Sequence, residues 1–167
     1  MKAYDTNFIK DQFPALQRKV WDKKLVYLDS AASMQKPKRV LDAISKSYSF
    51  NYSNVHRGLH KLSEEATAKY EGSRIKVAKF INCSENEVIF TSGATAALNL
   101  IAYSWGMKNL SAGDEIIITI AEHHANIVPW QIIAEQKNVK IIAAHVDPNS
   151  NFDPAIIRNL VTDKTKI

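Results

Sequence analysis

EVIFTSGATAALNLIAYSWGMKNLSAGDEIIIT, residues 87–119, is the stretch that decides the fold. Residues 87–91 and 115–119 are short apolar runs typical of buried strands. Between them, apolar residues recur at helical spacing, namely Ala94, Ala97, Leu98, Ile101, Ala102 and Trp105. Short apolar strands separated by helices are typical of a parallel sheet with helices on its faces. The sequence therefore predicts an α/β fold, a parallel sheet with flanking helices.

The same alternation extends beyond this stretch in both directions. After it we expect a helix over residues 126–136, a strand over 139–146, a helix over 153–161 capped by Asp153, and the start of a fourth strand at 165–167. Before it we expect a short helix over residues 6–12 with Thr6 as N-cap, a strand over 25–28, a helix over 37–50, and a helix capped by Ser63. Along that last helix a three-and-four spacing predicts one buried face, made by Leu62, Ala66, Tyr70, Ser73, Val77 and Phe80.

Composition and charge exclude several classes of protein. The chain has 167 residues and no apolar run near the roughly 20 residues that span a bilayer, so no membrane partner is expected. Residues 1–5 lack the apolar core of a signal peptide, and we expect a cytoplasmic protein. The net charge is +5, but the lysines are scattered without a basic run, which argues against a nucleic-acid partner.

The single cysteine, Cys83, excludes a disulfide framework and a cysteine-rich metal site. A lone cysteine can be a nucleophile, but no histidine lies near Cys83 in the sequence. The competing interpretation is a small, half-buried residue at the end of a helix.

Ligands of open α/β sheets bind at the carboxyl ends of the strands, here the turns after Thr91, Thr119 and Val146. In the first turn Gly93 allows a close backbone approach, while Ser92 and Thr95 add hydroxyl groups. A helix N-terminus with free N–H groups binds anions, so this turn favours a phosphate. The alternative is a tight connection and a helix cap.

The second turn contains two adjacent histidines, His123 and His124. Adjacent side chains on an irregular segment point in different directions, and no third ligand has suitable spacing, so no metal site is predicted. One imidazole could stack on a flat aromatic ligand or move a proton near neutral pH. Both histidines could equally be exposed loop residues, and Asn126 could be the N-cap of the following helix.

Four motifs now stand in order along the chain: YLDSAAS at 27–33, VHRGLH at 55–60, FTSGAT at 90–95 and EHHANIVPW at 122–130. Together they resemble the front part of class V aminotransferase-like enzymes, most closely SufS-type cysteine desulfurases. The resemblance implies a partial fold-type I large domain, truncated before its central strands. It divides the chain into an N-terminal segment, residues 1–60, with small-domain and dimer-interface elements, and an incomplete cofactor-binding domain, residues 61–167.

The resemblance also implies a cofactor, a substrate and partners. These are pyridoxal 5′-phosphate, L-cysteine converted to L-alanine and an enzyme persulfide, a homodimer, and a sulfur-acceptor protein for iron–sulfur cluster assembly. Gly93, Ala94 and Thr95 resemble phosphate-binding positions, and His123 resembles the imidazole that stacks on the pyridine ring and assists proton transfer. Ala31, His56 and Arg57 resemble positions near the substrate and the partner subunit. Two positions depart from the family pattern, because Ala94 offers only its backbone N–H and Ala96 replaces a common glutamate.

Three groups that the family's covalent chemistry requires have no counterpart here. We find no lysine in the serine- and histidine-containing context of the Schiff-base lysine, since Lys69 and Lys76 fall on polar helix faces and Lys108 in a loop. Nor do we find the persulfide-carrying cysteine, which Cys83 does not match, or the arginine that binds the substrate carboxylate. Covalent attachment of the cofactor at the family position is therefore not expected.

Four hypotheses follow. The chain is a truncated desulfurase that is inactive alone; one half of a split desulfurase or selenocysteine lyase whose C-terminal half is encoded separately; a non-catalytic interaction module; or a small enzyme of unrelated chemistry that uses His123 or Cys83. The first is the preferred hypothesis.

Overall fold

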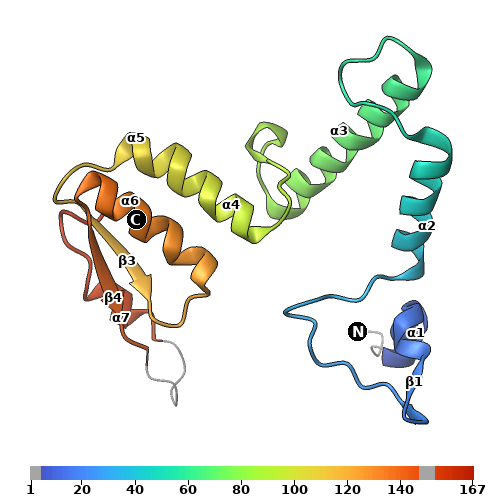
Figure 1. Ribbon diagram of the computed structural model, residues 1–167, viewed down its shortest axis with the longest axis horizontal. Helices are drawn as coiled ribbons and strands as arrows, with labels where there is room; N and C mark the ends of the chain where they lie inside the picture. Colours follow the sequence, from blue (N-terminus) through green and yellow to red (C-terminus); the bar gives the residue numbers. More distant parts are fainter. Residues whose placement is uncertain (1–4, 147–152) are drawn as a thin grey trace. The chain divides into compact units, whose positions relative to one another are not determined.

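The computed structural model describes residues 5–146 and 153–167, and Figure 1 shows the chain coloured along its sequence. The expectations for residues 1–4 and for the turn after Val146 lie outside these ranges. The chain forms two compact units, Met1–Val88 and Ile89–Ile167. This division is one of compactness. The assignment of residues 1–60 and 61–167 to two parts of a larger enzyme stays a prediction.

The unit Met1–Val88 is mainly helical. Its helices are α1 (Thr6–Asp11), α2 (Lys38–Lys46) and α3 (Lys61–Ile81), and a π-helical turn, Ser47–Asn51, continues α2. Short 3-10 turns occupy Pro14–Gln17 and Glu85–Glu87. The strands β1 (Lys19–Val20) and β2 (Lys23–Lys24) form a small antiparallel hairpin, with Lys19 opposite Lys24. The predicted helices over 6–12, 37–50 and from residue 63 are therefore present with shifted ends.

Two local predictions near the start of this unit are wrong, namely the N-cap of α1 and the strand over residues 25–28. The N-cap of α1 is Asp5, whose carboxylate accepts the N–H groups of Asn7 and Phe8, and not Thr6. No strand forms over residues 25–28 among the described residues, and Val26 and Leu28 are exposed. An apolar run becomes a strand only where a neighbour completes its hydrogen-bonded ladder, and the hairpin forms just upstream of this run.

The start of α3 also differs from the prediction. His60 is the N-cap, and its Nδ1 accepts the N–H of Ser63 at 3.4 Å. Ser63 is buried in the first turn, where its hydroxyl donates to the carbonyl of Asn54 and accepts the N–H of Gly58. The predicted apolar face is only partly correct, because Leu62 and Phe80 are exposed while Ala66, Tyr70 and Val77 are half-buried.

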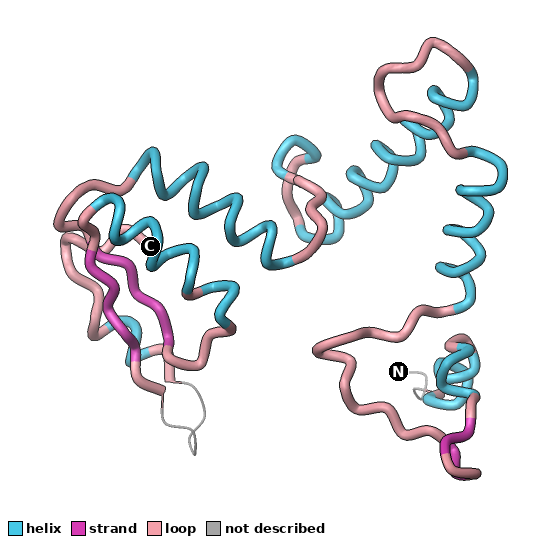
Figure 2. Tube along the Cα trace, in the orientation of Figure 1, coloured by secondary structure: helices cyan, strands magenta, loops and turns pink. Residues whose placement is uncertain are grey.

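The unit Ile89–Ile167 contains the parallel sheet. Its helices are α4 (Ala94–Ile101), α5 (Met107–Asn109), α6 (Val128–Lys137) and α7 (Ala155–Arg158), with a π-helical turn, Ala102–Gly106, between α4 and α5. The strands β3 (Glu115–Thr119) and β4 (Lys140–Ala144) pair in parallel with Glu115 opposite Lys140, and they lie side by side in Figure 2. Residues 165–167 begin a further parallel pairing on β3, where Thr165 bridges to Glu115. The predicted α/β fold is confirmed.

The first predicted strand of this sheet, residues 87–91, does not form. Glu85–Glu87 is a 3-10 turn, and no described segment forms a ladder with residues 88–91. The run therefore stays irregular, and Ile89 is exposed. Its apolar sequence alone does not supply the neighbouring strand that the hydrogen-bonded ladder requires.

A single apolar cluster holds the sheet to its helices. Ile116 and Ile118 alternate toward it from β3, and Trp130 and Ile133 enter it from α6. The rest of the cluster is made by Ala102, Leu110, Ala134 and Val139. Pro129 lies in the first turn of α6, where a missing N–H costs nothing. Across the described ranges, no helix has the length and apolar character needed to cross a membrane.

Candidate functional site

The turn at Gly93 joins an irregular segment to α4. The hydroxyl of Thr91 donates to the carbonyl of Gly93 at 3.0 Å, and Gly93 is the N-cap of α4 with φ +157°. Side chains rarely adopt this φ, although the space around Gly93 is open. No side chain caps the helix, and Gly93, Ala94 and Thr95 are exposed. The first N–H groups of α4 thus point toward solvent at the positive end of a helix, which suits an anion.

His123 follows β3 and begins the 3-10 turn His124–Asn126. Its Nδ1 accepts the N–H of Ala125 at 3.1 Å, so the neutral ring carries its proton on Nε2. The ring of His124 lies edge-on, with centroids 6.2 Å apart and planes at 87°. The two rings thus form an edge-to-face pair with nearly perpendicular planes, and both histidines are exposed. His123 can offer a flat ring face and one N–H donor.

A polar network that the sequence analysis missed fixes the His123 loop. The Glu122 carboxylate accepts the Thr119 hydroxyl at 3.1 Å and the Asn126 amide at 2.9 Å. Asn126 in turn accepts the indole N–H of the buried Trp130 at 3.2 Å. The i, i+4 spacing of Glu122, Asn126 and Trp130 is the signal that could have revealed it. Asn126 therefore ties the loop to the core and is not the predicted N-cap, a position that Ile127 takes.

The two turns belong to the same compact unit. Helix α4 packs against the 3-10 turn that follows His123. A hollow of about 290 Å³ is lined by Leu98 of α4 and by Glu122 and Asn126, whereas Gly93 and His123 are not part of its lining. The anion-suited turn therefore begins the helix that packs against the turn after the exposed imidazole.

The remaining predicted site residues lie in the Met1–Val88 unit. Ala31 is exposed in a turn that the Ser33 N–H closes by donating to the carbonyl of Asp29 at 3.0 Å. The Tyr27 hydroxyl also hydrogen-bonds to the Ser33 carbonyl. Arg57 is exposed and forms no ion pair with residues 5–146 or 153–167.

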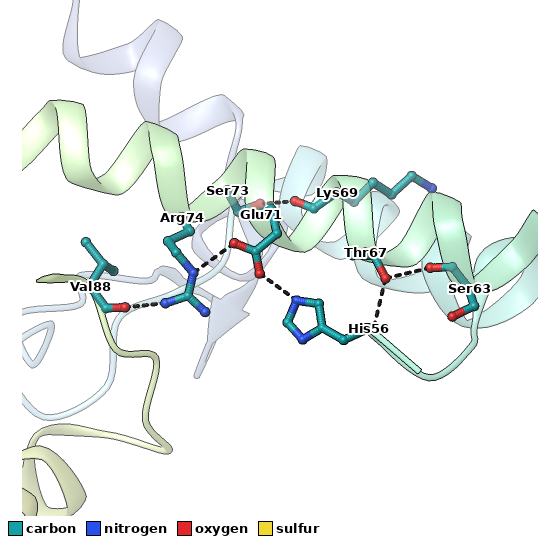
Figure 3. Close-up of polar contacts among 8 residues, drawn as sticks. All are labelled: His56, Ser63, Thr67, Lys69, Glu71, Ser73, Arg74 and Val88. Carbon is teal, nitrogen blue, oxygen red and sulfur yellow. Dashed lines mark hydrogen bonds and ion pairs between the residues drawn. The ribbon is translucent and has the colours of Figure 1, made fainter. Parts of the chain in front are cut away.

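His56 is the most constrained of these residues. Its backbone is left-handed, with φ +72°, and its N–H donates to the Thr67 hydroxyl at 2.9 Å. Its Nε2 lies 2.7 Å from the Glu71 carboxylate. Figure 3 shows this contact as a dashed line. The bond from His56 and the adjacent Arg74 guanidinium lower the pKa of Glu71. Thr67 and Glu71 gave no signal in the sequence, because they meet residue 56 through a loop closure.

The other nucleophile candidates have ordinary surroundings. Lys69 and Lys76 are exposed on α3, whereas Lys108 is exposed in the short helix α5 and not in a loop. Cys83 is half-buried, and its N–H donates to the carbonyl of Ala78 at the end of α3. No group of three or more metal-ligating side chains gathers among the residues that the structure describes.

Comparison with known proteins adds the family. Aminotransferase class-V matches residues 26–167. The chain belongs to this family. A probable cysteine desulfurase of Vibrio cholerae is 51% identical over 95% of this chain, and the match covers 40% of that protein.

Solved structures agree with the sequence matches. The apo cysteine desulfurase from Thermococcus onnurineus aligns with a TM-score of 0.82 at 32% identity, over 95% of this chain and 38% of that one. The cysteine desulfurase CsdA (S-sulfonic acid) from Escherichia coli aligns with a TM-score of 0.80 at 36% identity, over 99% of this chain and 40% of that one. The resemblance to the front part of cysteine desulfurases is therefore confirmed, and this chain spans 38% to 40% of the length of the curated relatives first matched.

Proposed function

We propose that this chain supplies the phosphate-binding and ring-stacking part of a pyridoxal 5′-phosphate site for cysteine desulfurisation. The observation that carries the proposal is the uncapped, exposed N-terminus of α4 at Gly93, in the same unit as the exposed His123 ring. Free N–H groups suit a phosphate, and a flat imidazole suits a pyridine ring. The residues present therefore fit this cofactor.

Each residue has a role that follows from its chemistry. The backbone N–H groups of Ala94 and Thr95 donate to phosphate oxygens, and the Thr95 hydroxyl adds a donor. Gly93 permits the close approach that a side chain would strain. His123 stacks by its ring face, and its Nε2 can donate or accept a proton. When bound, pyridoxal 5′-phosphate supplies an electron sink for negative charge that develops on the substrate.

The Met1–Val88 unit is assigned the substrate side of the same reaction. Arg57 offers a guanidinium to a carboxylate or persulfide anion, which its planar donors match. Ala31 and His56 lie near the substrate and the partner subunit in this proposal. L-cysteine is the substrate, alanine and a persulfide are the products, and a sulfur-acceptor protein takes the sulfur from a homodimeric, cytoplasmic enzyme.

The covalent step is assigned to a lysine and a cysteine that have no counterpart among residues 1–167. No lysine of this chain stands in the family's context, so the 167 residues are expected to be inactive alone. Activity requires a C-terminal segment that carries the Schiff-base lysine and the persulfide-forming cysteine.

A chimaera tests this function directly. Residues 1–167 replace the corresponding front part of the Vibrio cholerae relative, and release of alanine and sulfide from L-cysteine is measured. We expect turnover in the chimaera, and a fall in kcat of about 10²- to 10⁴-fold in His123→Ala, because a positioned acid–base group contributes this much. The matched control is His124→Ala, which removes an adjacent exposed imidazole and should retain kcat. A folded, cofactor-loaded chimaera without turnover, or equal losses in both variants, contradicts the proposal.

A further inference from the structure

The backbone at His56 is held in a left-handed conformation by one face of α3. The His56 N–H donates to the Thr67 hydroxyl, which itself donates to the carbonyl of Ser63 at 2.8 Å. The His56 ring meets Tyr70 edge-on at 5.8 Å between centroids and bonds Glu71. Thr67, Tyr70 and Glu71 are spaced by three and four, so they share one side of the helix. A positive φ at a residue other than glycine is uncommon, and such conformations cluster at functional sites.

The Glu71 carboxylate is itself fixed on its other side. Its Oε1 lies 2.7 Å from His56 Nε2, while its Oε2 accepts Nε–H of Arg74 at 3.0 Å. Arg74 also donates to the carbonyl of Val88 and lies over the Tyr70 ring at 5.2 Å from the centroid. Figure 3 shows this chain of contacts running from Val88 through Arg74 and Glu71 to His56. The carboxylate therefore has both oxygens engaged and little freedom to rotate.

These contacts determine which nitrogen of His56 carries a proton. The pKa of Glu71 is lowered, first by the bond to His56 and also by Arg74, so the carboxylate is ionised at neutral pH. An ionised carboxylate only accepts hydrogen bonds, so Nε2 must be the donor. In the neutral ring, Nδ1 then keeps its lone pair. The side chain of His56 is 52% exposed and lines an open hollow of about 470 Å³ with Gly58, Glu64 and Thr67.

We propose that Glu71 is a positioning residue that acts through His56, holding Nε2–H so that Nδ1 is the basic nitrogen available to a substrate thiol. The assignment of a thiol rests on the proposed function. The orientation of His56 by Glu71 does not depend on it. Arg74 holds the Glu71 carboxylate, and Glu71 in turn holds His56. Carboxylates commonly set the tautomer of a functional histidine in this way.

The first arm of the test uses the full chain without cofactor. Long-range ¹H–¹⁵N spectra at pH 8 should show His56 protonated at Nε2 and unprotonated at Nδ1. Exchange of the Nε2 proton with water should rise about tenfold or more in Glu71→Ala and stay slow in Glu71→Gln, whose amide oxygen still accepts. Glu64→Ala is the matched control, since Glu64 lines the same hollow and does not bond His56. Protonation at Nδ1 in the unsubstituted chain overturns the proposal, and this result does not require any variant to fold. Unchanged exchange in a folded Glu71→Ala variant also overturns it.

The second arm uses the active chimaera described above. Glu71→Ala should lower kcat/KM for L-cysteine by about 10- to 100-fold, which is the size of effect seen when a carboxylate that orients a functional histidine is removed. The cofactor absorbance should be unchanged. Glu71→Gln should restore most of the loss. Adding Glu71→Ala to His56→Ala should cause no further loss, because the carboxylate acts only through the imidazole. Additive losses overturn the positioning role, whereas an inactive unsubstituted chimaera refutes the proposed function and leaves the first arm to decide on Glu71.

Discussion

Gly93→Ala should weaken binding of pyridoxal 5′-phosphate to the full chain by about 10- to 100-fold. Gly93 has φ +157°, where a Cβ is strained by roughly 1–3 kcal/mol, so alanine favours a backbone that turns the first N–H groups of α4 away from the phosphate. The affinity is measured by titration of the cofactor, followed by absorbance.

The control for this substitution is Gly72→Ala. A Cβ at Gly72 also meets open space, but Gly72 lies within α3 at an ordinary helical conformation. Its affinity for the cofactor should equal that of the unsubstituted chain. If Gly93→Ala binds as tightly as Gly72→Ala, the phosphate does not use the N-terminus of α4.

Ile133→Ala should destabilise the Ile89–Ile167 unit by about 2–5 kcal/mol, because it leaves a cavity in the core as well as removing buried methyl groups. Ile133 is fully buried at 0% exposure, between α6 and the sheet. If the free energy of unfolding of the unit is smaller than this loss, the variant is unfolded even without urea. Equilibrium denaturation by urea, followed by circular dichroism, measures the change.

Ile120→Ala is the matched substitution for Ile133→Ala. Ile120 follows β3 directly and is 52% exposed, so the same deletion of methyl groups should change the free energy of unfolding by less than about 1 kcal/mol. Equal effects at the two positions would mean that Ile133 is not in a packed core.

Local patterns in the sequence were sufficient to predict the strands β3 and β4 and the helices α4 and α6. The apolar runs of β3 and β4 pair with each other, and they pack against helices of the same unit. The runs at residues 25–28 and 87–91 have similar composition but form no strand, because pairing depends on a neighbour and not on the run itself. Helix caps were missed where Asp5 and His60 compete with nearby hydroxyl residues.

The candidate site shows the same difference between local and non-local information. Gly93 and His123 could be singled out because each follows a predicted strand in a parallel sheet. The contact between His56 and Glu71 joins residues 15 apart through a loop, and no periodicity encodes it. The network of Glu122, Asn126 and Trp130 does have helical spacing, but polar residues at that spacing are also common on solvated faces.

The departures from the family pattern at positions 94 and 96 limit the groups that the proposed phosphate site, Gly93–Thr95, and its surroundings can offer to a ligand. Ala94 has no hydroxyl, so in the proposed site this position offers a phosphate only its backbone N–H. This makes the conformation of Gly93 more important, because it directs the backbone groups that remain. Ala96 has no charge, so this position cannot form an ion pair.

We propose that this chain binds the phosphate of pyridoxal 5′-phosphate at Gly93–Thr95 and its ring at His123, without a lysine for covalent attachment. Titration of the full chain with pyridoxal 5′-phosphate, then borohydride reduction and peptide mass spectrometry, tests both parts at once. We predict saturable binding that inorganic phosphate competes away, with no stoichiometric adduct on any one lysine. A stoichiometric adduct at a single lysine, or no binding that phosphate displaces, would contradict the claim.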